Sequence, residues 1–176
     1  MAAERTTALS GLFNFIRRLT AGWALVGGVL IIALVLVNTW SLISGFVMRR
    51  PVPGDFEITQ VATAVAVFTF LPYCQITGAN VTADIFTERA GPRLKAVLAA
   101  LGSFLALLFA TVLGWRTYEG LLDLVKYRET TAIYQFPHWI AYVPIVISLA
   151  LLILAALVTL ITAVTMSGPE EEEALF

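Results

Sequence analysis

Four long apolar runs constrain the fold of this chain more than any other feature of its sequence. They cover residues 23–46, 58–78, 94–115 and 139–164. A helix needs about 20 apolar residues to cross a bilayer core of roughly 30 Å, and each run is long enough. Because a helix satisfies its own backbone hydrogen bonds in lipid, we predict an all-α membrane protein whose four transmembrane helices form one domain, residues 23–166.

The composition favours the same class of protein. Hydrophobic residues make up 59% of the 176 residues and charged residues only 13%, which is far from the balance of a soluble protein. The first run is too long for the core of a signal peptide, and no small-residue cleavage site follows it. We therefore expect this run to remain in the mature protein. Nothing in the charge pattern indicates a nucleic-acid partner.

The segments outside the four runs differ in character. Residues 1–22 include "LSGLFNFIRRL", in which apolar residues recur at helical spacing while Arg17 and Arg18 lie on the opposite face. We predict an amphipathic helix in the membrane interface, with both arginines directed toward anionic headgroups. The alternative is that the first helix simply extends into water. Residues 167–176 form an acidic tail that we expect to be disordered.

The distribution of lysine and arginine predicts the orientation in the membrane. One side, which holds both termini and the second loop, carries Arg5, Arg17, Arg18, Arg89, Arg93 and Lys95. The other side carries Arg49, Arg50, Lys126 and Arg128, with Arg116 near the end of the third run. The bias places both termini in the cytoplasm. Trp139 and Tyr142 then belong to an aromatic belt at the outer lipid interface.

The segment "MRRPVPGDFEITQ" interrupts the apolar pattern between the first two runs. Pro51 and Pro53 prevent the first helix from continuing. We expect Asp55 to cap the second helix and Glu57 to interact with the positive end of its dipole. These features describe a stiff turn between antiparallel helices, and a role in binding a partner remains open beside it.

Groups that could carry chemistry are few. The chain has one histidine, His138, and one cysteine, Cys74. A single chain therefore cannot hold a haem between two histidines, a disulfide or a thiolate metal cluster, and we predict no cofactor and no metal site. No histidine lies at the depth of the serines in the first run, so we predict that the chain is not an enzyme. A membrane-embedded enzyme stays as a minor alternative.

The ionisable residues are expected at or beyond the ends of the spans. Arg116, Glu119 and Asp123, for example, follow the third run at spacings that allow pairing along a helix. A transporter that acts alone needs an ion or substrate site near the midplane, and this pattern offers none. The sequence therefore favours a chain that supports another membrane polypeptide.

Three stretches carry a resemblance to a known family: "RRPVPGDFEITQ", "ITGANVTADIFTERAGPRLK" and "TTAIYQFPHWIAYVPIVISLALLIL". Their order, the length of the chain and the four spans resemble the small membrane subunit of tripartite ATP-independent periplasmic (TRAP) transporters, the DctQ-like family. The chain departs from that family at Asn80, where a histidine is frequent, and near Glu57, where paired acids are frequent.

The resemblance implies a scaffold in the inner membrane of a bacterium or archaeon. The small subunit would bind a large multi-span subunit that carries the sodium and substrate sites of a symport system. A periplasmic binding protein would capture the substrate, an organic acid. The small four-helix subunit of another tripartite carboxylate transporter has similar size and role, and it is the closest alternative.

The resemblance also suggests where partners bind. Arg49, Arg50, Asp55 and Glu57 would face the periplasm and contact the binding protein or the edge of the large subunit. On the cytoplasmic side, Asn80 and Asp84 follow the second helix, and Asp84 matches an aspartate of the family. These are the six candidate partner-interface residues.

Overall fold

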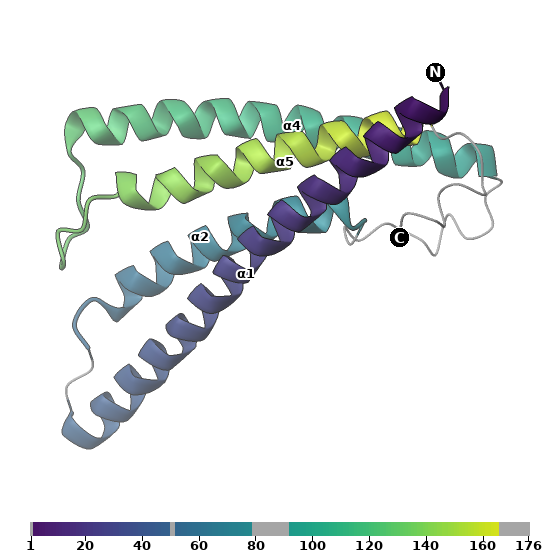
Figure 1. The fold of residues 1–176 in the computed structure, drawn as a ribbon. Helices are drawn as coiled ribbons and strands as arrows, with labels where there is room; N and C mark the ends of the chain where they lie inside the picture. Colours follow the sequence, from purple (N-terminus) through teal and green to yellow (C-terminus); the bar gives the residue numbers. More distant parts are fainter. Residues whose placement is uncertain (1, 50–51, 79–91, 166–176) are drawn as a thin grey trace.

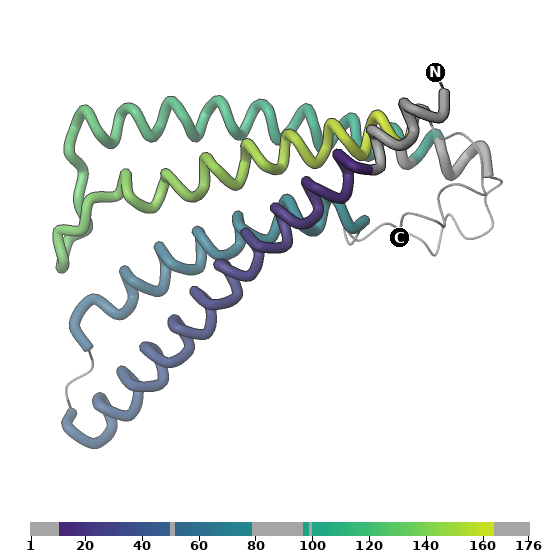
Figure 2. The backbone as a smooth tube through the Cα atoms, in the orientation of Figure 1, coloured from purple at the N-terminus to yellow at the C-terminus, as the bar shows by residue number. Residues whose placement is uncertain are grey.

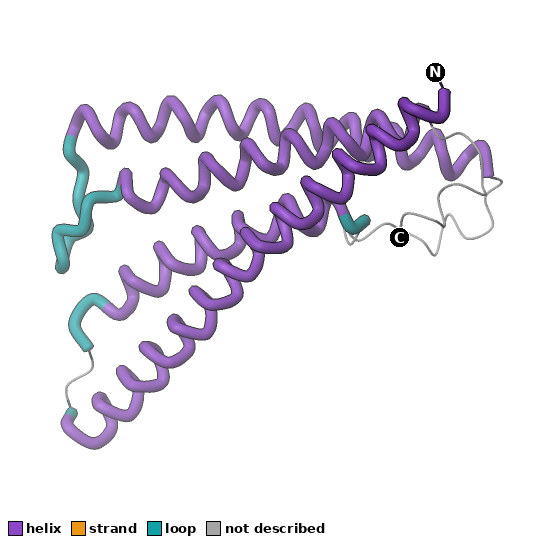
Figure 3. The backbone as a smooth tube through the Cα atoms, in the orientation of Figure 1, coloured by secondary structure: helices purple, strands orange, loops and turns teal. Residues whose placement is uncertain are grey.

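The computed structural model describes residues 2–49, 52–78 and 92–165, and its regular elements are four helices (Figure 1). They are α1 (Ala2–Met48), α2 (Asp55–Ile76), α4 (Pro92–Tyr127) and α5 (Trp139–Thr165). Each is long and apolar enough to cross a membrane, which confirms the predicted fold class. Loops are confined to the helix ends in the described ranges (Figure 3).

The helices form two antiparallel hairpins, α1 with α2 and α4 with α5. The hairpins join through α2 and α5, so the order across the bundle is α1, α2, α5, α4, and α1 makes a smaller contact with α5. In the tube view, the hairpins approach each other near the N-terminal end of α1 and separate toward the α1–α2 and α4–α5 loops (Figure 2). This arrangement places both of these loops at one end of the molecule.

The first helix has no break where the sequence suggested a boundary. α1 continues through residue 22 as one helix of 47 residues. Phe13 and Ile16 are buried in a cluster with Ile76, Ala155 and Val158, so part of the predicted amphipathic face packs on α2 and α5. The placement of residues 1–22 in the membrane interface stays a prediction.

Small residues let α1 approach α2. A Cβ atom added to Gly27 would overlap Thr69 Oγ1 and lie 3.1 Å from Thr69 Cβ, and the neighbouring Ala66 is fully buried. A Cβ atom added to Gly28 would meet nothing within 4 Å. The contact glycine is Gly27, because the direction of α2 decides which side of α1 it meets.

The packing of α4 on α5 fixes how the two helices are aligned. A Cβ atom added to Gly114 would lie 3.5 Å from Ile153 and 3.8 Å from Leu149, residues that flank the centre of α5. Arg116 follows Gly114 by two residues, so it lies beside the middle of α5, and α4 continues beyond it to Tyr127. The sequence had suggested that Arg116 lies at the end of a span. Hydropathy alone missed this, since the apolar run ends at residue 115 and the helix does not.

The interior of the bundle contains only neutral polar groups in the described residues. The buried polar side chains are Thr20, Ser41, Thr69, Gln75, Thr131 and Ser148. Two of them join helices: Trp23 Nε1 donates to Ser148 Oγ at 2.8 Å, and Gln75 Nε2 donates to Thr159 Oγ1 at 3.2 Å. Such bonds satisfy polar groups that would otherwise be unpaired in a low-dielectric interior.

Candidate functional site

The α1–α2 turn is held by Asp55 in a way that the sequence did not predict. Gly54, with φ of 71°, is the N-cap of α2, and Asp55 is the first helical residue rather than the cap. Ser41 Oγ donates to Asp55 Oδ2 at 2.6 Å, and the backbone N–H of Val52 donates to Ser41 Oγ at 3.2 Å. The Asp55 carboxylate therefore ties the start of α2 to the last turns of α1.

Glu57 binds the other loop at this end of the molecule. The backbone N–H of Ile133 donates to Glu57 Oε1 at 3.0 Å, and that of Tyr134 approaches Oε2 at 3.5 Å, a weak contact. The helix dipole was the expected partner of Glu57, yet its carboxylate also reaches a segment 76 residues away in the chain. Charge-assisted bonds of this kind are stronger than neutral ones.

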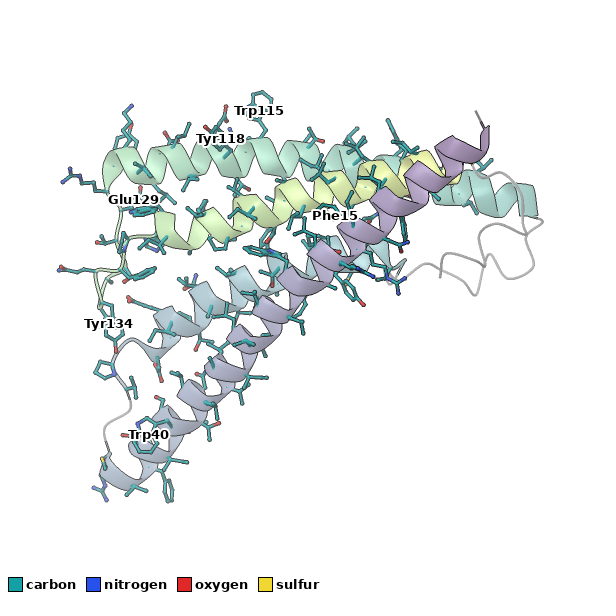
Figure 4. The ribbon with its side chains drawn as sticks, viewed as in Figure 1. Phe15, Trp40, Trp115, Tyr118, Glu129 and Tyr134 are labelled. Carbon is teal, nitrogen blue, oxygen red and sulfur yellow. The ribbon has the colours of Figure 1, made fainter. Side chains whose placement is uncertain are left out.

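A ring contact reinforces the same junction. Figure 4 shows Tyr134 at the tip of the α4–α5 loop, directed toward the start of α2. A Cβ atom on Gly54 would lie only 2.5 Å from Tyr134 Cε2, so the ring lies directly against the glycine backbone. Position 54 therefore favours glycine for two reasons: its positive φ and the absence of space for a side chain. We call this contact between Gly54, Glu57 and residues 133–134 the loop junction.

The α4–α5 loop has its own hydrogen bonds, so it presents a defined shape to Glu57. Thr131 N–H donates to the Phe136 carbonyl at 2.9 Å, and Phe136 N–H donates to Thr131 Oγ1 at 3.0 Å. His138 N–H donates to the Glu129 carbonyl at 3.1 Å, which closes the base of the loop. The loop junction thus joins two ordered turns.

The six candidate partner-interface residues fall into three groups. Asp55 and Glu57 are used in contacts within the chain, as described above. Arg49 is exposed and ends α1 with φ of 54°, a conformation that costs a non-glycine residue energy. Arg50, Asn80 and Asp84 lie outside the described residues, and their roles stay predictions.

The candidate lipid-interface residues also differ among themselves. Arg17, Arg18 and Trp139 are exposed. Tyr142 is half-buried, and its Cε1 would lie 3.4 Å from a Cβ atom at Gly120, so its ring packs between α5 and α4. Tyr142 therefore has a packing role in addition to the predicted one in the aromatic belt.

A polar row between α1 and α2 was missed by the sequence analysis. Thr59 Oγ1 donates to Asn38 Oδ1 at 3.0 Å, one turn from the bond between Ser41 and Asp55. The sequence contained a signal for this contact: Asn38 and Ser41 are three residues apart on α1, and Asp55 and Thr59 are four residues apart on α2. Two such rows on consecutive helices predict an interhelical polar contact.

The described ranges contain no group of three or more His, Cys, Asp or Glu residues that could hold a metal ion. The Nδ1 atom of His138 is buried and has no hydrogen-bond partner within these ranges. The contacts described above join helices and loops through hydrogen bonds of Asp55 and Glu57.

The comparison with known families gives a direct result. Residues 34–166 match the model of the DctQ component of tripartite ATP-independent periplasmic transporters. Neither the comparison with curated proteins nor that with solved structures gave a match. The matched range covers α1 from residue 34 to its end, and all of α2, α4 and α5. It covers far more than half of the chain, so this protein belongs to the DctQ component family of the TRAP transporters.

Proposed function

We propose that this chain, the small membrane subunit of a TRAP transporter, acts as a scaffold for a large transport subunit. In this proposal, the large subunit binds sodium and an organic acid and moves them together across the membrane. The small subunit carries neither ligand. It holds the large subunit in a fixed position in the bilayer while that subunit changes conformation.

The observation that supports a scaffold most strongly is the chemistry of the bundle interior. Its buried polar side chains are neutral in the described residues, and two of them, Ser148 and Gln75, bond to Trp23 and Thr159 of neighbouring helices. A sodium ion prefers several oxygen ligands with negative charge nearby, and a carboxylate needs cationic or N–H donors. The carboxylate of Asp55 lies at the end of α1 and α2, where it already accepts hydrogen bonds from Ser41 and from the Phe56 N–H.

The loop junction supports the same proposal. The α1–α2 hairpin and the α4–α5 hairpin are joined at one end by Glu57 and Tyr134, and nearer the centre by the bond between Trp23 and Ser148. Contacts at two levels resist a change in the angle between the hairpins. A scaffold requires this resistance, whereas a carrier must open and close.

The partners and location follow from the family and remain proposals for this chain. We place it in the inner membrane with both termini in the cytoplasm, so that the loop junction faces the periplasm. Arg49 and Arg50 then contact the periplasmic binding protein or the large subunit, while Asp55 and Glu57 shape the turn that presents them. On the cytoplasmic side, Asn80 and Asp84 contact a partner, with Asp84 pairing with an arginine.

Reconstitution into liposomes tests the function. Vesicles with an imposed sodium gradient would receive the large subunit and the binding protein, with or without this chain, and uptake of a radiolabelled dicarboxylate, keto acid or sialic acid would be measured. We expect uptake only when all three proteins are present. We also expect no binding of sodium or of the organic acid to the purified chain by calorimetry. Tight binding of either ligand to this chain alone would contradict the proposal.

A further inference from the structure

The outer face of α4 carries a charged and aromatic patch that the scaffold proposal does not use. Arg116 and Glu119 form an ion pair at 3.1 Å, and their side chains are 76% and 43% exposed. Trp115 is 66% exposed and Tyr118 50% exposed. Figure 4 shows Trp115 and Tyr118 on the side of α4 that faces away from α5. We call these four residues the α4 outer patch.

The packing of α4 on α5 places this patch at the depth of the membrane core. Gly114 lies opposite Leu149 and Ile153, which flank the centre of α5. Arg116 and Glu119 follow Gly114 by two and five residues, which is a rise of about 3 Å and about 7.5 Å. Both distances are smaller than half of a bilayer core about 30 Å thick. The charges therefore lie well inside the span.

Lipid is a poor neighbour for such a patch. An ion pair exposed to hydrocarbon loses its hydration, and the attraction between the two charges does not fully restore what is lost. Charged groups at this depth in membrane proteins face other protein or a water-filled cavity. On this chain, however, the pair faces outward, and the described residues give it no contact from another helix.

Other outward faces show what a surface suited to lipid looks like in this protein. One stripe of α1 is exposed along three turns and consists only of aliphatic side chains: Leu25, Val29, Ile32 and Leu36. On α5, Ile147 is exposed at nearly the depth of the α4 outer patch and has no polar exposed neighbour one turn away. The outer face of α4 therefore differs from these aliphatic faces in carrying charged and aromatic side chains at a similar depth.

We propose that the α4 outer patch is the surface on which a transmembrane helix of the large subunit docks. This inference rests on the proposed function, because it assigns the place where the scaffold holds its partner. The docking helix presents polar or charged groups to Arg116 and Glu119 at mid-membrane depth, and its apolar side chains pack on Trp115 and Tyr118. Tryptophan, tyrosine and arginine are the residues that most often dominate interface energetics. An internal pair also leaves the remaining guanidinium donors of Arg116 for a partner.

Photo-crosslinking from the full complex tests where the partner lies. A photoreactive amino acid would replace Tyr118 in one variant and Ile147 in a second, which serves as a control at similar depth on α5. Each tagged chain would be irradiated in native membranes that contain the large subunit. We expect a covalent adduct with the large subunit from position 118 and adducts with lipid alone from position 147. Adducts with the large subunit from 147 and not from 118 would overturn the inference.

A charge exchange tests the role of the ion pair. The double variant Arg116→Glu, Glu119→Arg keeps a salt bridge within α4 but reverses its direction toward a partner. We expect it to fold as the wild type does, as judged by its unfolding midpoint in detergent, and to retain about tenfold less large subunit on co-purification. Undiminished co-purification of this variant overturns the inference while the scaffold proposal stands. Failure of the wild-type chain to co-purify with any large membrane subunit would instead contradict the scaffold proposal itself.

Discussion

The two hairpins of this bundle place their polar groups on opposite sides. In the α1–α2 hairpin, Ser41 and Asn38 bond to Asp55 and Thr59 between the helices, and the exposed stripe of α1 from Leu25 to Leu36 is aliphatic. In the α4–α5 hairpin, Gly114 contacts aliphatic side chains between the helices, and the charges lie on the outside of α4. Hydropathy does not distinguish these arrangements, because both hairpins qualify as pairs of membrane-spanning helices.

The difference indicates which groups stabilise the chain and which are free to bind a partner. The polar groups of the α1–α2 hairpin already have partners, so removing one leaves an unpaired group inside the bundle. The exposed groups of α4 lie outside the packing between α4 and α5. We therefore expect substitutions in the first hairpin to reduce stability, and substitutions on the outside of α4 to reduce assembly.

The largest effect is expected at Gly27. The substitution Gly27→Leu would place a side chain in the space of Thr69 and separate α1 from α2, which we expect to cost about 3 kcal/mol of unfolding free energy. Titration with SDS, followed by circular dichroism, would measure it. The matched control is Gly28→Leu, one residue away, where an added Cβ meets nothing within 4 Å. Equal losses from both variants would show that the α1–α2 contact lies elsewhere.

Removal of the Asp55 carboxylate should have the next largest effect. Asp55→Ala leaves Ser41 Oγ without its charged acceptor, and we expect a loss of about 2 kcal/mol in the same titration. Asp123→Ala is the control, since Asp123 is an exposed acid on α4 with no bond among the described residues. If the control destabilises the chain as much as Asp55→Ala does, the contrast between the hairpins is not supported.

A smaller and local effect is expected at the loop junction. Glu57→Ala removes the acceptor of the Ile133 N–H, and we expect hydrogen exchange at that amide to become about fivefold faster. The amide of Thr131 donates to the Phe136 carbonyl within the same loop and should exchange at an unchanged rate. If both amides exchange faster, Glu57 orders the whole loop. If neither amide exchanges faster, the loop junction is not supported.

The smallest effect concerns the contact between the hairpins near the membrane centre. Trp23→Phe removes the N–H that donates to Ser148 while it keeps most of the aromatic surface. Bonds of this kind between membrane helices contribute about 0.6 kcal/mol on average. A double-mutant cycle with Ser148→Ala would isolate the coupling between the two side chains. A coupling of zero would leave apolar packing as the only connection at this level.

The four spanning helices were predictable because each satisfies its own backbone hydrogen bonds and needs a continuous run of apolar residues, which is visible in the sequence. The residues through which two helices contact each other show no such local pattern. Gly27 and Gly28 are adjacent, and only the direction of α2 decides that Gly27 is the contact. Arg116 was expected at the end of a span for the same reason. Its depth depends on where α4 packs along α5, and hydropathy says nothing about that alignment.

The candidate site was predictable in its residues and less so in their partners. The sequence singled out Asp55 and Glu57 and explained them by the nearby helix terminus, which is the local interaction that a sequence can show. Their carboxylates bind Ser41 and Ile133, which come from other elements. Contacts of this kind depend on the way two loops meet in space. The matching polar rows at Asn38 and Thr59 were the one long-range signal that could have been found.

The length of α1 has a mechanical consequence. Ser41 meets the first residue of α2, and Phe13 lies in the same buried cluster as the last, Ile76. α1 has 47 residues, about 70 Å of helix, whereas α2 has 22 residues and about 33 Å. The contacts with α2 therefore hold only part of α1, and its first turns continue past the end of its neighbour. A helix longer than the bilayer core is accommodated by tilting, by kinking or by local thickening of the bilayer, so the surplus length of α1 links this bundle to the thickness of the membrane around it.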